Sequence, residues 1–181
     1  GVNTIAAGGN VDDFTRSFVQ SLAQSAISQL GESLANEIGG AKHRGDIGTA
    51  LQYVAHAGVG CLTGTATSKL TGTDTGLGCT SGAGGAVVGE AIGQLYQETL
   101  IDDVEEWLGE QVANDQPVSR EDIQRKVYEF KQRGVDLARL GAALTAFTLG
   151  GDVNIAAASG ANAAEHNALF TLSAIVIAAA Y

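Results

Sequence analysis

The sequence has 181 residues and a formal net charge of -10, because twenty Asp and Glu residues outnumber ten Lys and Arg residues. This charge argues against binding to a nucleic-acid backbone or to anionic lipid, both of which attract clustered Lys and Arg. Hydrophobic residues make up 45% of the chain, which excludes a disordered acidic tail, and the length predicts one domain with a sizeable core.

The first predicted element is a long amphipathic helix. Its apolar residues recur every three or four positions, which is the spacing of one helical face. They are Val11, Phe14, Phe18, Leu22, Ala26, Leu30, Leu34 and Ile38. Gly39 and Gly40 predict the end of this helix. Residues 1–10 have no basic segment followed by a long apolar one, so no signal peptide is predicted, and we expect the chain to be a piece of a longer protein.

The middle of the chain is predicted to be less regular. A second helix begins near Asp46 and loses its pattern among Gly58, Gly60 and Gly64. Residues 63–78 are rich in Thr and Gly, and we expect them to form a loop. A third helix is predicted to rise from residues 82–85.

The second half of the chain predicts two further helices. Residues 114–118 contain the only proline, and Ser119 with Asp122 resembles an N-terminal capping box. The fourth helix comes next and ends at Gly150, with Gly134 and Gly141 as points where it bends or breaks. The fifth helix spans roughly residues 152–166. The expected fold is therefore all-α, a compact bundle of about five helices with a Gly/Thr-rich, disulfide-closed loop in the middle.

Cys61 and Cys79 bracket the predicted loop. Two cysteines in an exported chain favour a disulfide, which the chain-entropy model values at about 3 kcal/mol for a loop of this size. Two buried thiols, a metal site with His56, and a thiol nucleophile paired with His56 or His43 remain alternatives. No metal-ligand spacing and no phosphate-binding glycine loop occurs, so no metal and no cofactor is expected.

His56 and Glu90 each lie among small apolar residues, and we expect both to be polar residues of the core. A buried carboxylate needs a partner, because an unpaired buried charge is costly. The alternative is a catalytic His–Glu pair. Separately, residues 98–122 hold nine acidic residues and one basic residue, which predicts a solvated helix face or a docking surface for a basic partner.

Two stretches together resemble a known family. The first is Leu51-Gln-Tyr-Val-Ala-His-Ala-Gly-Val-Gly-Cys61 with Gly78-Cys79-Thr-Ser-Gly-Ala-Gly-Gly-Ala-Val-Val-Gly-Glu90, and the second is residues 151–169. In this order they resemble the pretoxin region of contact-dependent growth inhibition (CdiA-type) and filamentous-haemagglutinin-like exoproteins, which leave the cell by two-partner secretion. That family has a His-Ala…Gly-Cys…Cys…Gly-Ala…Glu block before a Val-Glu-Asn-Asn boundary, after which the toxin begins.

The boundary motif is altered in this sequence. Ala164-Glu165-His166-Asn167 replaces Val-Glu-Asn-Asn, so Glu165 and Asn167 match and His166 departs. The resemblance implies that Asn167 inherits the family's cleavage role, in which the side-chain amide attacks its own carbonyl. Residues 1–169 would then be a helical pretoxin domain, and residues 170–181 the apolar start of the segment after the boundary.

The resemblance implies a delivery module without catalytic activity. Its partners would be the C-terminal toxin of the same chain and, indirectly, the two-partner secretion transporter and the outer membrane of the target cell, with no nucleic acid. It would be secreted to the cell surface through the periplasm, where Cys61 and Cys79 meet an oxidising compartment. Two alternatives are a toxic effector with a Cys–His nucleophile and a membrane-active translocation domain, because small-residue spacing also eases helix packing in bilayers.

Overall fold

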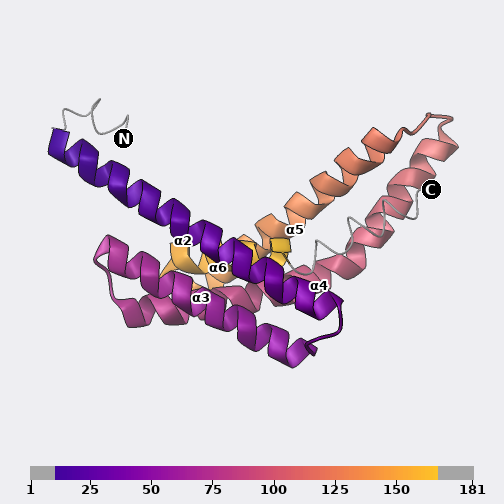
Figure 1. Ribbon diagram of the computed structural model, residues 1–181. Helices are drawn as coiled ribbons and strands as arrows, with labels where there is room; N and C mark the ends of the chain where they lie inside the picture. Colours follow the sequence, from indigo (N-terminus) through magenta and orange to yellow (C-terminus); the bar gives the residue numbers. More distant parts are fainter. Residues whose placement is uncertain (1–10, 167–181) are drawn as a thin grey trace.

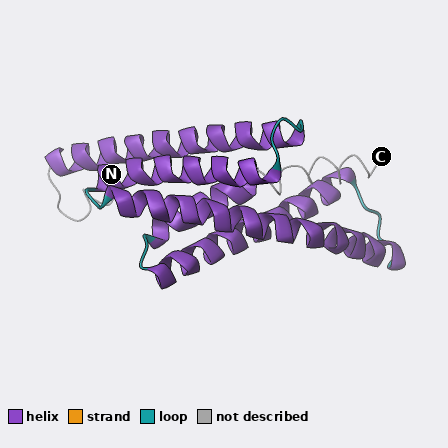
Figure 2. Ribbon diagram, turned by 90° about the horizontal axis from the view of Figure 1, so that it is seen from below, coloured by secondary structure: helices purple, strands orange, loops and turns teal. Residues whose placement is uncertain are grey.

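The computed structural model describes residues 11–166, which form five helices and, within that range, no strand (Figures 1 and 2). This confirms the predicted all-α bundle. The helices are α2 (Val11–His43), α3 (Thr49–Thr71), α4 (Thr75–Ala113), α5 (Arg120–Leu149) and α6 (Val153–His166).

The helices α3 and α4 form an antiparallel pair that carries the rest of the bundle. The short helix α6 packs against α4 and α5, while α2 lies mainly over α3 and touches α6. The second half of α4 and the first half of α5 leave the bundle together as a two-helix arm, coloured pink and orange in Figure 1. None of the helices in the described range is long and apolar enough to cross a bilayer.

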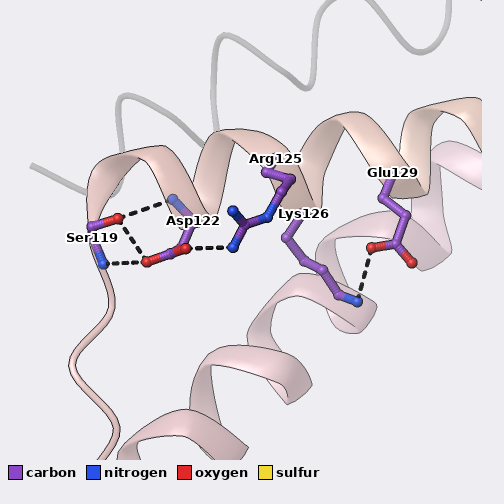
Figure 3. Close-up of polar contacts among 5 residues, drawn as sticks. All are labelled: Ser119, Asp122, Arg125, Lys126 and Glu129. Atoms are coloured by element: carbon purple, nitrogen blue, oxygen red, sulfur yellow. Dashed lines mark hydrogen bonds and ion pairs between the residues drawn. The ribbon is translucent and has the colours of Figure 1, made fainter.

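The helix ends in the second half of the chain agree with the predicted signals. The Ser119 hydroxyl accepts the Asp122 N–H, and the Asp122 carboxylate accepts the Ser119 N–H, so the predicted capping box is confirmed (Figure 3). Gly150 ends α5 in the left-handed conformation, with φ of 71°, as glycine does without strain. The Asp152 carboxylate then caps α6 by accepting the N–H groups of Asn154 and Ile155.

The predicted loop over residues 63–78 is wrong. The helix α3 continues through Gly64 to Thr71, and α4 begins at Thr75, before the predicted start at Gly82. Only residues 72–74 connect them, and Gly72 makes the turn with φ of 74°. Threonine hydroxyls in this region donate to carbonyls of their own helix, as Thr71 does to Thr67. The disulfide therefore joins two helices and does not close a loop.

Glycine was also misleading elsewhere. Gly39 and Gly40 lie inside α2, which ends at His43, and α5 runs unbroken through Gly134 and Gly141. An isolated glycine lowers helix propensity by only about 1 kcal/mol relative to alanine. Tertiary contacts outweigh that cost in α5, where a Cβ on Gly141 would lie 2.2 Å from the Ile92 side chain.

Glycines allow unusually close contacts between three helices. A Cβ on Gly60 of α3 would lie 2.2 Å from the Gly82 carbonyl oxygen of α4, and a Cβ on Gly64 would lie 2.1 Å from the Gly78 carbonyl oxygen. On another face of α4, a Cβ on Gly89 would meet the Gly160 oxygen of α6 at 2.1 Å. Large buried side chains gather instead where the arm joins the bundle, namely Leu100, Val104, Val127 and Phe130.

These contacts predict opposite effects for two glycines of α4. We expect Gly82→Ala to destabilise the fold by about 1–3 kcal/mol, because its Cβ would overlap the Gly60 carbonyl. Gly84→Ala is the matched control, since a Cβ there has open space and alanine favours helix. Urea unfolding measures both, and equal midpoints would contradict the close packing.

Candidate functional site

The residues singled out in the sequence meet along one contact, the seam between α3 and α4. On α3 the buried face consists of every fourth residue: Gln52, His56, Gly60, Gly64 and Ser68. The contacts of Gly60 with Gly82 and of Gly64 with Gly78 fix the antiparallel register. The same register brings Gln52 to Glu90 and places His56 opposite Ala86, with which it lines a small cavity.

Glu90 is fully buried, with 0% of its surface exposed, and its carboxylate is held by side-chain amides. Gln52 Nε2 and Gln94 Nε2 each donate to Glu90 Oε1 at 2.7 Å. The Tyr53 hydroxyl extends the network by donating to Gln94 Oε1 at 3.2 Å. Burial, and secondarily the nearby Glu90 carboxylate, raises the pKa of Tyr53. A buried carboxylate is tolerated only with such partners, so these amides are part of the fold.

His56 is 1% exposed and lies where four helices meet. It lines a cavity of about 10 Å³ together with Ala35 of α2, Ala86 of α4 and Asn162 of α6. The prediction of two polar core residues is thus in keeping with the burial of His56 and Glu90. Neither side chain is accessible to a substrate in this conformation.

The predicted disulfide is confirmed, and it lies next to the glycine contacts. Cys61 follows Gly60, Cys79 follows Gly78, and the two sulfurs are bonded. Their Cα atoms are 3.7 Å apart, a spacing close to that of consecutive residues in one chain. Both cysteines of the chain are used in this bond, so neither provides a thiolate nucleophile in the oxidised protein.

A shallow groove of about 310 Å³ lies between α2, α3 and α6. Gly31, Thr63 and Asn162 form its floor region, and Glu32 and Glu165 are among the residues that line it. Within residues 11–166, no three His, Cys, Asp or Glu side chains converge as metal ligands. The groove therefore offers polar contacts but no assembled catalytic or metal-binding set in the described part of the chain.

The described part of the boundary motif packs against α2. His166 Nδ1 lies 2.9 Å from Asn36 Oδ1, and Glu165 lines the groove. Burial lowers the pKa of His166, although the carboxylates of Glu165 and Glu32 oppose this shift. Asn167 and residues 170–181 lie outside the described residues.

The acidic segment belongs to the arm. Described acidic residues such as Asp102, Glu105 and Glu110 are solvent-exposed, in accord with a solvated face. On α5 the ion pairs join neighbours one turn apart, as between Arg125 and Asp122 and between Lys126 and Glu129 (Figure 3). Exposed pairs of this kind contribute little to stability.

Comparisons of the chain with protein-family models, with curated proteins and with solved structures found no match. What the protein does is therefore inferred from its own residues and their geometry. Sequence reasoning found His56, Glu90 and the two cysteines, and it missed Gln52 and Gln94. The four-residue spacing of Gln52, His56, Gly60 and Gly64 was the available signal for Gln52.

The amide–carboxylate network predicts a cost for removing one donor. Gln52→Ala leaves the buried Glu90 carboxylate with one hydrogen bond fewer, and we expect a loss of about 1–3 kcal/mol in the free energy of unfolding. Gln20→Ala, at an exposed helical glutamine, is the control and should change it by less than about 0.5 kcal/mol. Indistinguishable values in urea unfolding would contradict a structural role for the network.

His166 predicts a pH dependence. Because its pKa in the folded protein is lowered from 6.5, the unfolded chain binds the proton more tightly. The stabilisation from neutral His166 is therefore complete well above pH 6.5 and is lost as the pH falls through that value. We expect the free energy of unfolding to fall more between pH 7.5 and 5.5 in the wild type than in His166→Gln. Equal falls in the two proteins would contradict this assignment.

Proposed function

We propose that this protein is the noncatalytic pretoxin module of a secreted contact-dependent growth inhibition exoprotein. In this role it holds a C-terminal toxin of the same chain and helps to pass that toxin into a neighbouring bacterium. The observation that supports this most is the convergence of the resemblance's first block on the α3–α4 seam. His56, Cys61, Cys79 and Glu90 come from two helices, and each lies on or next to this contact.

The burial of these residues favours a structural role over a catalytic one. A catalytic group must reach a substrate, whereas Glu90 is closed off between Gln52 and Gln94. A residue set that fixes helix register is what a module needs if its work is to fold, carry and release another domain. The runner-up, a toxic effector with a cysteine nucleophile, first requires reduction of the disulfide.

The disulfide also supports the proposed location. A cysteine pair that ties two helices together forms and persists in an oxidising compartment such as the bacterial periplasm. We place the module on the export route through the periplasm to the cell surface, and from there to the envelope of the target cell.

The position of the boundary supports a module that ends near α6. The helix ends at His166, whose side chain contacts Asn36 of α2, directly before Asn167 in the sequence. A toxin attached after this point would emerge beside α2 and α6. We propose Asn167 as the point of release.

A bacterial competition experiment tests the function. In the full-length exoprotein with its transporter and toxin, we expect the Cys61→Ser/Cys79→Ser pair to lower toxin delivery to sensitive target cells by at least tenfold, because the seam is no longer tied. Display of the upstream filament, measured with a surface antibody, should stay unchanged. Gly84→Ala, which adds a methyl in open space, is the control and should deliver normally.

Two results would oppose this function. Unchanged delivery after deletion of residues 11–166 means that the module has no part in transfer. Growth arrest on expressing the chain alone in bacterial cytoplasm, relieved by Cys61→Ser, would instead identify an effector enzyme.

A further inference from the structure

One end of the bundle carries exposed apolar side chains and few charges. We name it the apolar end and define it by Leu77, Leu144, Phe147, Leu149 and Val153, all of which are exposed. Phe147 is 72% exposed and Leu149 is 81% exposed, which is far from the burial that such side chains prefer. Scattered apolar residues are normal on a surface, so what matters is their grouping and their surroundings.

The last turns of α5 are apolar on both sides. Ala138, Ala142 and Ala146 are buried and face the bundle. Leu140, Leu144 and Phe147 recur at helical spacing on the opposite side and face outward. This helix therefore presents large apolar side chains to the surroundings and small ones to the core, which is the reverse of a water-facing helix.

Leu77 and Val153 belong to the same end because the α5–α6 turn is fastened to α4. The Asp152 N–H donates to Ser81 Oγ at 2.7 Å across that turn. Leu77 precedes Ser81 by one helical turn on the same face of α4. The α3–α4 turn at residues 72–74 lies just before Leu77, so both helical hairpins turn at this end.

The polar groups of the apolar end are satisfied by the protein itself. The hydroxyls of Thr145 and Thr148 donate to the carbonyls of Gly141 and Thr145 in their own helix. The Gly150 N–H satisfies the carbonyls that end α5. Few donors and acceptors are left for water or for a polar partner, and a hydrocarbon environment makes the same demand.

Charge is distributed to match. Residues 140–151 contain no charged side chain, and the two acids nearest to the apolar end, Asp74 and Asp152, cap α4 and α6. The acidic residues of the arm lie at the other end of α5, whose 30 residues span about 45 Å. Lys69, at the end of α3, has an aliphatic stem and a charge that reaches toward phosphate groups.

We propose that the apolar end inserts into the interface of a lipid bilayer, with the acidic arm directed away from it. The contact is made by side chains at one end of the bundle and does not require a spanning helix. A protein partner is the less suitable occupant, since protein interfaces have a polar rim with hydrogen bonds, and the polar groups here are already satisfied. This inference does not rest on the pretoxin function, although it would give that module a way to meet a target membrane.

Vesicle binding tests the inference. We expect the wild-type chain to sediment with phosphatidylcholine vesicles, and Leu144→Ser/Phe147→Ser/Leu149→Ser to bind at least about tenfold more weakly, because three apolar side chains no longer leave water. Leu95→Ser/Val112→Ser is the matched control: both leucine and valine are as exposed, but they lie on α4 outside the apolar end. The control should bind within about twofold of the wild type.

Tryptophan fluorescence tests the orientation. The only tryptophan of the chain, Trp107, lies on the acidic arm. Brominated lipid should leave its emission unchanged, while it should quench Phe147→Trp measured with Trp107→Phe in the same chain. Stronger quenching of Trp107 than of the new indole would overturn the proposed orientation.

Three other outcomes overturn the proposal. They are no sedimentation of the wild type with vesicles, equal losses in the triple variant and its control, and a concentration-dependent dimer in solution that the triple variant abolishes while vesicles bind nothing. The last would identify the apolar end as a contact between two copies of the chain. Circular dichroism on all variants separates these outcomes from a failure to fold.

Discussion

The close approach of α3 and α4 is the constraint on which the rest of the molecule depends. At the Gly60–Gly82 and Gly64–Gly78 contacts the backbones leave no room for a Cβ atom. That proximity lets the disulfide join the helices one residue away from each contact. It also sets the register in which Gln52 reaches Glu90, so the apolar, covalent and polar contacts all require the same alignment of the two helices.

The helix α4 must satisfy this constraint on two sides. Gly78 and Gly82 face α3, while Gly85 and Gly89 face α6, which approaches as closely through Ala156 and Gly160. A bundle built in this way gains dispersion energy from backbone contact and buries few large side chains. Dispersion weakens steeply within the first ångström of separation, so such a bundle is either fully packed or open. The covalent link between Cys61 and Cys79 then has a clear purpose, because it limits how far the seam can open.

The sequence predicted the features that depend on local patterns. Apolar periodicity identified the long helices, and the Ser119–Asp122 box and Gly150 marked true helix ends. It failed at residues 63–78 because glycine and threonine were read as loop formers, although their environment is set by a partner helix. The four-residue spacing of Gly60 with Gly64 and of Gly78 with Gly82 was visible and indicated helix contact. Gln52 and Gln94 were missed because a glutamine on a helix is usually exposed, and only the register with Glu90 makes them core residues.

Two kinds of packing divide the molecule along α5. Its first half joins the arm through Val127 and Phe130, which pack with Leu100 and Val104 of α4 as ordinary large core residues. Its second half contributes Ala138, Ala142 and Ala146 to the close-packed region and turns leucine and phenylalanine outward. Because one continuous helix connects them, the acidic arm and the apolar end are held at a fixed separation. The net charge is therefore not a general acidity. It is placed at one end of a rigid helix, where it favours solubility without screening the apolar end from whatever that end contacts.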